Sequence, residues 1–252
     1  MARRNREVGV IKSCVLKSCV LAAALVAGLA FPAQADDKKI TLSATTVLTT
    51  DYMFRSISNT NQRPAAQAEF DLYYGIFYAG IWGSNTAYGD GIEIDYYAGI
   101  TPKWGDVTFN FAALYYSYPG ADSEIGYFEA KAGASYTSGK WTFGINDYWS
   151  PDNFQVFGNS NAIEGSIAYA FSGKLFNFFT PTISGGLGFQ SYEEIASDYT
   201  YWNAGLTLGF MNNFSVDVRY YDTDYSETEC FIQSGARPNC DARAVGTLKA
   251  VF

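Results

Sequence analysis

Histidine is absent from the sequence of 252 residues. Zinc sites built on imidazole, Ser-His-Asp triads and Cys-His pairs all require that side chain, so the composition excludes them. An aspartate pair would be the one arrangement left for acid-base catalysis. We therefore expect a protein that is not an enzyme, with no catalytic residues, no metal site and no cofactor.

Cysteine is also rare, and two of the four cysteines lie in an N-terminal segment of distinct composition. That segment, residues 1–35, places five basic residues before the apolar run 19–31 and ends on Ala33-Gln34-Ala35. This order predicts a cleaved secretory signal peptide over residues 1–35. A membrane anchor is the alternative, but the apolar run is shorter than the ~20 residues of a spanning helix.

The other two cysteines, Cys230 and Cys240, lie in the stretch ECFIQSGARPNC. An exported chain passes through an oxidising compartment, where such a pair forms a disulfide. We expect a bridge between Cys230 and Cys240 that closes a small loop, with two free thiols as the alternative.

No apolar run after residue 35 reaches the ~18 residues of a transmembrane helix. Without residues 1–35 the chain has 12 basic and 24 acidic residues, a net charge of −12. This balance argues against nucleic acid as a partner. Residues 36–252 contain no low-complexity linker and are predicted to form one domain.

Aromatic residues are abundant, at 17% of the chain, and apolar and polar positions alternate along most of it. Residues 107–118, VTFNFAALYYSY, and 214–221, FSVDVRYY, are typical. A period of two predicts β-strands, and most segments have the length of a tilted strand that crosses a bilayer. The predicted strands are residues 40–55, 65–74, 76–86, 91–101, 107–118, 126–138, 141–149, 161–172, 179–191, 199–211, 214–224 and 243–252.

The connections between these segments are mostly short and long in alternation. If the first strand starts in the periplasm, the turns on that side include residues 138–140 and 211–213, and the external loops include 150–161 and 223–242. Short periplasmic turns, longer external loops and an even strand number are typical of outer-membrane barrels, whose closure removes strand edges. We therefore predict an all-β fold, a closed antiparallel transmembrane β-barrel of about 12 strands over residues 36–252.

A soluble β-sandwich or a lipocalin-like barrel is the alternative, because a period of two does not tell which face is wet. The signal peptide, strand length, loop asymmetry and aromatic content favour the bacterial outer membrane. Trp104, Trp141 and Trp149 lie near predicted strand ends, where such rings form interfacial girdles.

The sequence ends in GTLKAVF, in which Gly246, Leu248, Ala250 and Phe252 share one face. We predict that this stretch is the closing strand and pairs with the first strand. A terminal Phe on such a strand is also what outer-membrane assembly machinery reads, so Phe252 is the predicted assembly signal.

Three stretches resemble a known family, namely DYMFRSISNTNQRPAAQAEFDLYYGIFYAGIWGSN (51–85), EIDYYAGI (93–100) and YYSYPGADSEIGYFEA (115–130). They are similar to TorF-type porins, a family of conserved hypothetical outer-membrane proteins of proteobacteria. The D-Y-x-F-R and Y-A-G-x-W-x-S-N elements are the more specific ones. The family usually has Gly after D-Y-x-F-R, where this chain has Ser56. The resemblance implies an outer-membrane barrel and a channel, without an established substrate or catalytic residues.

Charged residues gather on the face opposite the apolar stripe, which would be the lumen if the stripe faces lipid. The predicted pore-lining residues are Glu69, Asp71, Glu93, Asp95, Glu129, Lys131, Glu164, Asp217, Arg219 and Lys249, and Asp147 and Arg243 are assigned to the same face. The excess of carboxylates predicts a mild preference for cations. The alternative is that these charges merely neutralise one another across strands.

A twelve-stranded barrel is narrower than the 16-stranded porins, so we expect a narrow pore pinched by an inward-folded loop. The candidates are residues 150–161 and the disulfide loop 230–240, whose apolar residues could instead pack against the barrel mouth. Asp51, Arg55 and Arg63 are predicted at the outer end of the first strand and in the loop that follows it. They form either a solvated cluster or a site for lipopolysaccharide phosphate or an anionic solute.

Together these features predict a porin-like channel in the bacterial outer membrane for passive diffusion of small hydrophilic solutes or ions. The alternative is a non-conducting structural or adhesion barrel that acts through its external loops. The expected partners are outer-membrane lipid and lipopolysaccharide, the assembly machinery, and small solutes or ions. The sequence is also compatible with an oligomer.

Overall fold

The computed structural model describes residues 39–89, 91–121 and 125–252, so the predicted signal peptide lies outside the described residues. Within the described part, twelve long strands form the wall: β1 (Ile40–Thr49), β4 (Ala65–Tyr74), β5 (Phe77–Asn85), β6 (Ile92–Ile100), β8 (Val107–Ser117), β9 (Tyr127–Ser138), β10 (Trp141–Ser150), β11 (Ser160–Ala170), β12 (Thr180–Tyr192), β13 (Tyr199–Phe210), β14 (Phe214–Thr223) and β15 (Arg243–Val251). The remaining elements are the short strands β2 (Met53–Phe54), β3 (Ile57–Ser58) and β7 (Lys103–Trp104), the helix α1 (Glu227–Ser234) and the 3-10 helix η1 (Arg237–Cys240).

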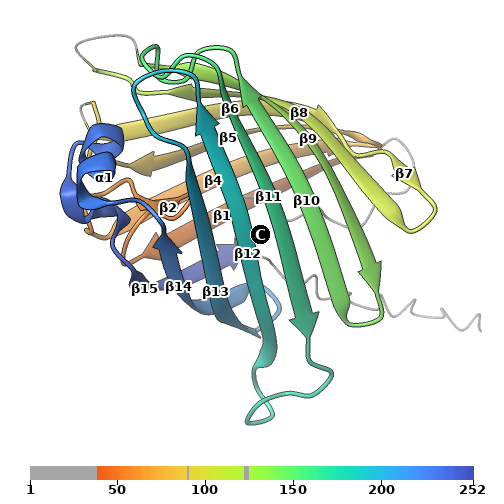
Figure 1. Cartoon of the computed structure of the whole chain (residues 1–252). Helices are drawn as coiled ribbons and strands as arrows, with labels where there is room; N and C mark the ends of the chain where they lie inside the picture. Colours follow the sequence, from red (N-terminus) through yellow and green to blue (C-terminus); the bar gives the residue numbers. More distant parts are fainter. Residues whose placement is uncertain (1–38, 90, 122–124) are drawn as a thin grey trace, which may run out of the picture.

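The wall strands form a closed antiparallel barrel (Figure 1). Each wall strand pairs with its neighbours along the chain, and β1 closes the ring on β15. Phe252 continues this seam, because its N–H donates to the carbonyl of Ala44 over 2.8 Å and its carbonyl accepts from the N–H of Ala44 over 3.0 Å. The predicted fold class is confirmed, with the C-terminal stretch as the closing strand.

The outer face of the wall is apolar and exposed. Leu42, Phe70 and Leu187 on this face are 71%, 61% and 60% exposed. Water disfavours such a continuous apolar belt, whereas the hydrocarbon core of a bilayer accommodates it. The alternating positions point inward and carry buried polar side chains such as Asp71 and Thr207. The polar face of the strands therefore lies inside the barrel. A soluble lipocalin-like barrel, the alternative considered from the sequence, would have its polar face outside.

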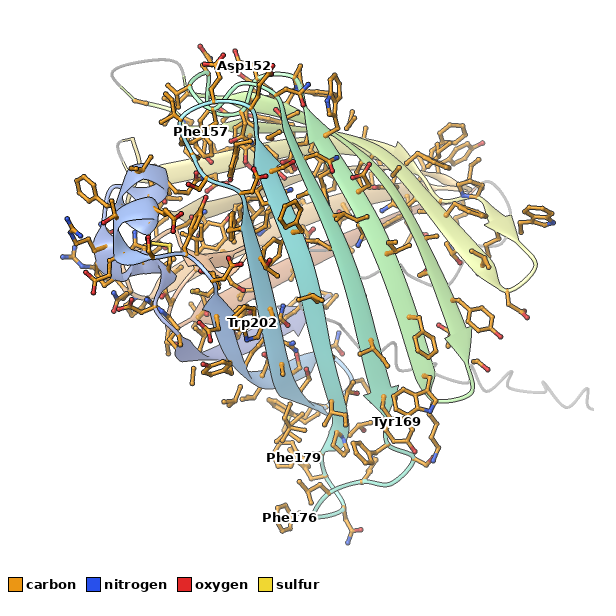
Figure 2. The ribbon with its side chains drawn as sticks, in the orientation of Figure 1. Asp152, Phe157, Tyr169, Phe176, Phe179 and Trp202 are labelled. Atoms are coloured by element: carbon orange, nitrogen blue, oxygen red, sulfur yellow. A yellow bond between two sulfur atoms is a disulfide. The ribbon has the colours of Figure 1, made fainter. Side chains whose placement is uncertain are left out.

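The two ends of the barrel differ in the length of their connections. One end, called here the short-turn end, has the connections 75–76, 101–106, 139–140, 171–179 and 211–213. The other, the long-loop end, has 50–64, 86–91, 118–126, 151–159, 193–198 and 224–242. Aromatic side chains extend from the short-turn end, where Trp104 is 82% exposed and Phe176, labelled in Figure 2, is 83% exposed. This is the placement expected of rings at a membrane interface.

The first wall strand is shorter than the sequence predicts. It ends at Thr49, and residues 50–64 turn into the barrel instead of continuing the wall. We call residues 50–64 the inward hairpin. Its strands β2 and β3 pair antiparallel and are joined by Arg55 and Ser56, which have φ of 47° and 60°. Two positive φ values match the turn that joins tight hairpins, so Ser56 accepts the backbone conformation that Gly adopts more easily.

The longest external connection, residues 224–242, is stabilised locally. Ser226 begins α1 with a capping box, in which its hydroxyl accepts from the N–H of Glu229 and the Glu229 carboxylate accepts from the N–H of Ser226. Hydrogen bonds from Ser226 lower the pKa of the Glu229 carboxyl. A disulfide joins Cys230 to Cys240, the pairing expected from the sequence. No helix of the described residues is long and apolar enough to cross a membrane.

Candidate functional site

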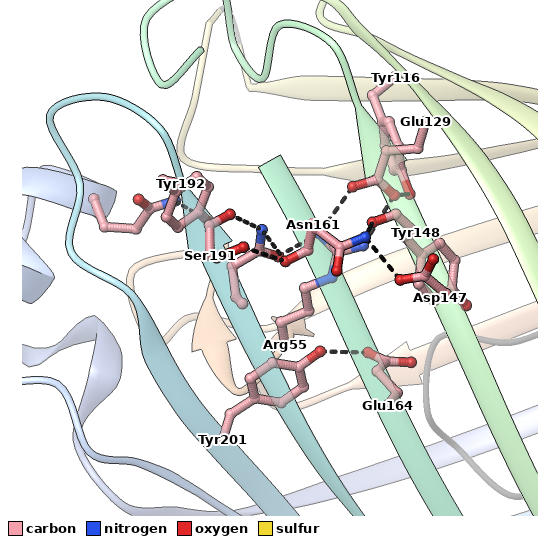
Figure 3. Close-up of polar contacts among 12 residues, drawn as sticks. Arg55, Tyr116, Glu129, Asp147, Tyr148, Asn161, Glu164, Ser191, Tyr192 and Tyr201 are labelled. Carbon is pink, nitrogen blue, oxygen red and sulfur yellow. Dashed lines mark hydrogen bonds and ion pairs between the residues drawn. The ribbon is translucent and has the colours of Figure 1, made fainter. Parts of the chain in front are cut away.

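The tip of the inward hairpin inserts a charged side chain into the lumen. Arg55 donates from Nη1 to Glu129 Oε1 over 2.8 Å and from Nη2 to Glu129 Oε2 over 2.9 Å (Figure 3). Nη1 also donates to Gln190 over 2.7 Å, and the guanidinium lies 4.7 Å from the ring centre of Phe54. Glu129 belongs to β9 and Gln190 to β12, so Arg55 bridges two distant parts of the wall. This paired arrangement satisfies a charge that would be costly if buried alone.

Further contacts hold the hairpin across the lumen. Asp51 accepts from Ser58 over 2.6 Å and forms an ion pair of 2.9 Å with Arg243 of β15. The hydroxyl of Ser56 donates to the carbonyl of Trp202 over 3.1 Å. The hairpin is thus bonded to strands on several sides of the barrel and occupies part of the lumen.

The two segments expected to pinch the pore lie beside the inward hairpin at the barrel mouth. In the loop 151–159, Phe154 packs on Tyr127, with ring centres 4.6 Å apart, and Phe157 packs on Tyr192 at 5.3 Å. The disulfide loop packs Cys230 into a cluster with Ile57 of the hairpin. Phe154, Phe157 and Cys230 thus pack against the barrel mouth, the alternative the sequence left open, whereas Val156, Phe231 and Ile232 are exposed.

The ten predicted pore-lining side chains all lie at inward positions. Eight are buried, and Glu69 and Lys249 are half-buried. Asp147 is a correction, because it is exposed on the outer face, where it accepts a hydrogen bond from Asn161 over 2.7 Å. It is two residues from Ile145 and from Trp149, so the period of a strand places it with these outward side chains.

Several inward charges form ion pairs within the lumen. Arg219 donates to Asp217 over 3.1 Å and also to Asn203 and Ser184, both over 2.8 Å. Together with the pairs of Arg55 and Arg243, this neutralises three acids with three bases. Some of the lumen charges therefore neutralise one another, as the alternative drawn from the sequence expected.

Other inward carboxylates contact tyrosine hydroxyls. The hydroxyl of Tyr97 lies 2.9 Å from Glu69 and 2.6 Å from Asp71. The hydroxyl of Tyr201 donates to Glu164 over 2.7 Å.

Like Glu69, Asp71 and Glu164, the carboxylates of Glu93 and Asp95 take part in no ion pair within the described part of the chain. They occupy adjacent inward positions of β6 and are 1% and 8% exposed. Glu93 accepts from the hydroxyl of Tyr52 in the hairpin over 3.3 Å. Glu93 Oε2 and Asp95 Oδ1 have no hydrogen-bond partner among the described residues. A buried carboxylate pair without a nearby base either takes up a proton or binds a cation.

The role of Arg55 was not predictable from local pattern. The sequence suggested a solvated cluster or an anion site at the barrel rim, but Arg55 is 9% exposed and paired with a carboxylate, whereas Arg63 remains exposed. Its partners Glu129 and Gln190 are 74 and 135 residues away in the chain, so no short-range signal links them. Among the described residues, no group of three or more His, Cys, Asp or Glu side chains is placed to hold a metal ion.

Solved structures with the same fold include two described as porins. The structure described as "KdgM porin" superimposes with a TM-score of 0.56 at 10% identity and covers 83% of this chain and 99% of its own. The structure described as "NanC porin" gives a TM-score of 0.52 at 12% identity and covers 84% of this chain and 98% of its own. At these identities the likeness shows the fold. A comparison with curated proteins finds no match.

A family model described as "Bacterial protein of unknown function (Gcw_chp)" matches residues 33–252. The match covers all the described strands, including those with the D-Y-x-F-R and Y-A-G-x-W-x-S-N elements. The TorF-type designation is not part of this description, so it stays a resemblance. The chain belongs to the Gcw_chp family of bacterial proteins.

Proposed function

We propose that this protein is an outer-membrane channel for passive diffusion of small hydrophilic solutes or ions, with a mild preference for cations. The observation that carries the proposal is the charge balance of the lumen. Outside the ion pairs, five inward carboxylates (Glu69, Asp71, Glu93, Asp95 and Glu164) face the two amino groups of Lys131 and Lys249 among the described residues. Carboxylates that line a pore favour cations.

The membrane location rests on the wall. A closed barrel leaves no unpaired strand edge, and its exposed apolar outer face fits lipid. The loop asymmetry assigns the long-loop end to the outside, where lipopolysaccharide would surround it. Phe252 is 65% exposed at the end of the seam and lies edge-on to Phe214, a position accessible to assembly machinery.

The experiment is planar-bilayer recording of the refolded mature protein under a KCl gradient. We expect discrete conductance steps with a cation-selective reversal potential. In the variant Glu93→Gln/Asp95→Asn, the reversal potential should move toward zero, because two of the five inward carboxylates outside the ion pairs are removed. Asp147→Asn is the matched control, since it removes a carboxylate from the outer face and should leave the reversal potential unchanged. Equal effects of the two variants would contradict the assignment of the filter.

A non-conducting barrel that acts through its external loops is the second candidate. The observation that favours it is the hairpin, whose buried Arg55–Glu129 pair lies across the lumen. A folded, heat-modifiable barrel that never conducts would support this candidate and reject the channel.

A further inference from the structure

A cavity of about 280 Å³ lies at the long-loop end, and the inward hairpin forms part of its wall. Its lining comes from all six long connections or the strand ends beside them, including Phe54, Tyr88, Tyr118, Phe154, Tyr192 and Gln233. The volume equals that of roughly nine water molecules in the liquid, enough for one ring with its substituents. A space built from so many separate segments depends on the whole fold.

The walls of this cavity are largely aromatic. Phe154 contacts Tyr118 and Tyr127 with ring centres 5.5 Å and 4.6 Å apart, and Phe157 continues the wall toward Tyr192. Aromatic walls favour the flat face of a ring or a surface of C–H groups, and the polar edges of such a ligand then need hydrogen bonds.

Two lining residues carry carboxamide oxygens that lack a partner. Asn153 is 2% exposed, and its Oδ1 has no hydrogen-bond partner among the described residues. Gln233 donates from Nε2 to the hydroxyl of Tyr192 over 3.0 Å, but its Oε1 has no partner within the same part of the chain. Both residues line the cavity. Unpaired buried acceptors are costly, so a ligand that offers hydroxyl or N–H donors would be stabilised there.

The cavity offers no free charge to a ligand. Arg55 is the one charged side chain among its described lining residues, and Glu129 already pairs with it. Burial raises the pKa of Tyr88 and of Tyr118 well above the ordinary value, so both phenols are neutral at physiological pH. A charged ligand would lose its hydration without gaining a counter-charge.

We propose that this cavity binds a small neutral ring molecule that carries at least two hydroxyl or N–H donors. A neutral sugar ring and a hydroxylated aromatic ring share this chemistry. The inference goes beyond the channel function, because equilibrium binding at the outer mouth does not require conduction.

The test is isothermal titration calorimetry of the refolded full barrel with two neutral probes, methyl glucoside and 4-hydroxybenzyl alcohol, and a charged comparator, glucuronate. We expect saturable binding of one neutral probe at one site per chain and at least tenfold weaker binding of glucuronate. Binding of methyl glucoside would indicate a sugar ligand, and binding of 4-hydroxybenzyl alcohol would indicate a hydroxylated aromatic ligand.

Variants locate the site. Asn153→Ala and Gln233→Ala should each weaken binding about 5- to 10-fold, the effect of losing one hydrogen bond. Phe154→Ala should weaken it further by removing part of the wall. Gln155→Ala is the matched control, because Gln155 belongs to the same loop, is exposed and does not line the cavity. Heat-modifiable mobility in gels confirms that each variant is folded.

The proposal is overturned if neither neutral probe binds saturably to the folded barrel. It is also overturned if Asn153→Ala, Gln233→Ala and Phe154→Ala all bind as the wild type does. A barrel that binds a probe but does not conduct would reject the proposed channel and leave this inference intact.

Discussion

At the scale of single residues, Arg55 has two functions in the lumen. Its guanidinium compensates the buried carboxylate of Glu129, to which Tyr116 also donates over 2.9 Å, and it fixes the tip of the inward hairpin. The same contact therefore contributes to stability and holds the hairpin tip inside the lumen.

Arg55→Met should destabilise the barrel by about 3–5 kcal/mol, because it leaves Glu129 buried without a counter-charge. It should also raise single-channel conductance, because the hairpin tip loses its anchor. Thermal loss of heat-modifiable mobility and bilayer recording measure the two effects.

The double variant Arg55→Met/Glu129→Leu should recover much of the stability, since neither charge of the buried pair remains. It should keep the higher conductance, because the hairpin tip still lacks its anchor. Arg237→Met is the control. It breaks an exposed ion pair with Glu227 at 3.8 Å, which we expect to contribute less than about 1 kcal/mol. Unchanged conductance in both hairpin variants would show that the Arg55 contact does not limit the pore.

At the scale of elements, the segment 224–242 is an external module stabilised by its own contacts. The capping box begins α1, Gly235 ends it with a φ of 74°, and the disulfide connects it to η1. Cys230 is fully buried against the inward hairpin. The module thus covers the hairpin from the outside without being part of the wall.

Cys230→Ser/Cys240→Ser should loosen this module and leave the wall intact. A bridge over a loop of this length contributes about 2.5–3 kcal/mol by constraining the unfolded segment. We expect new protease cleavage within residues 224–242 and unchanged heat-modifiable mobility of the barrel, both followed by mass spectrometry and gels. Cooperative loss of the whole barrel in this variant would show instead that the module supports the wall.

At the scale of the whole molecule, the tolerance of a position to a charged substitution depends on whether it faces lipid or the lumen. Val218 on β14 points outward and is 57% exposed, whereas Ser215 on the same strand is an inward, half-buried position. One face must suit hydrocarbon and the other the lumen.

Val218→Arg should lower the free energy of unfolding in lipid vesicles by about 2–4 kcal/mol, the cost of a charge near the bilayer midplane. Ser215→Arg should cost much less, because the new charge faces the lumen. Denaturant titration of the vesicle-inserted protein compares them. A similar loss in both variants, or a larger loss in Ser215→Arg, would argue against a lipid-facing outer wall.

Much of this architecture follows from local pattern. Except at the outer end of the first strand, the alternation located the wall strands to within two residues, because a strand's side-chain period is set by its own backbone. Loop lengths distinguished the two ends of the barrel. The same alternation supplied the ten inward positions from Glu69 to Lys249. It failed for Asp147 because a charged residue at an outer strand end was assigned to the lumen by its chemistry and not by its position in the period.

What the sequence by itself determined is the closed barrel, its strand spacing and the chemistry of its two faces. Only the tertiary structure decided which face is outside, where the first wall strand ends, and which segment occupies part of the lumen. The alternation is unchanged when a barrel is inverted, so the period alone does not determine whether the polar face lies inside or outside the closed barrel. The inward hairpin depends on partners such as Glu129 and Gln190, 74 and 135 residues from Arg55, which come together only when the barrel closes.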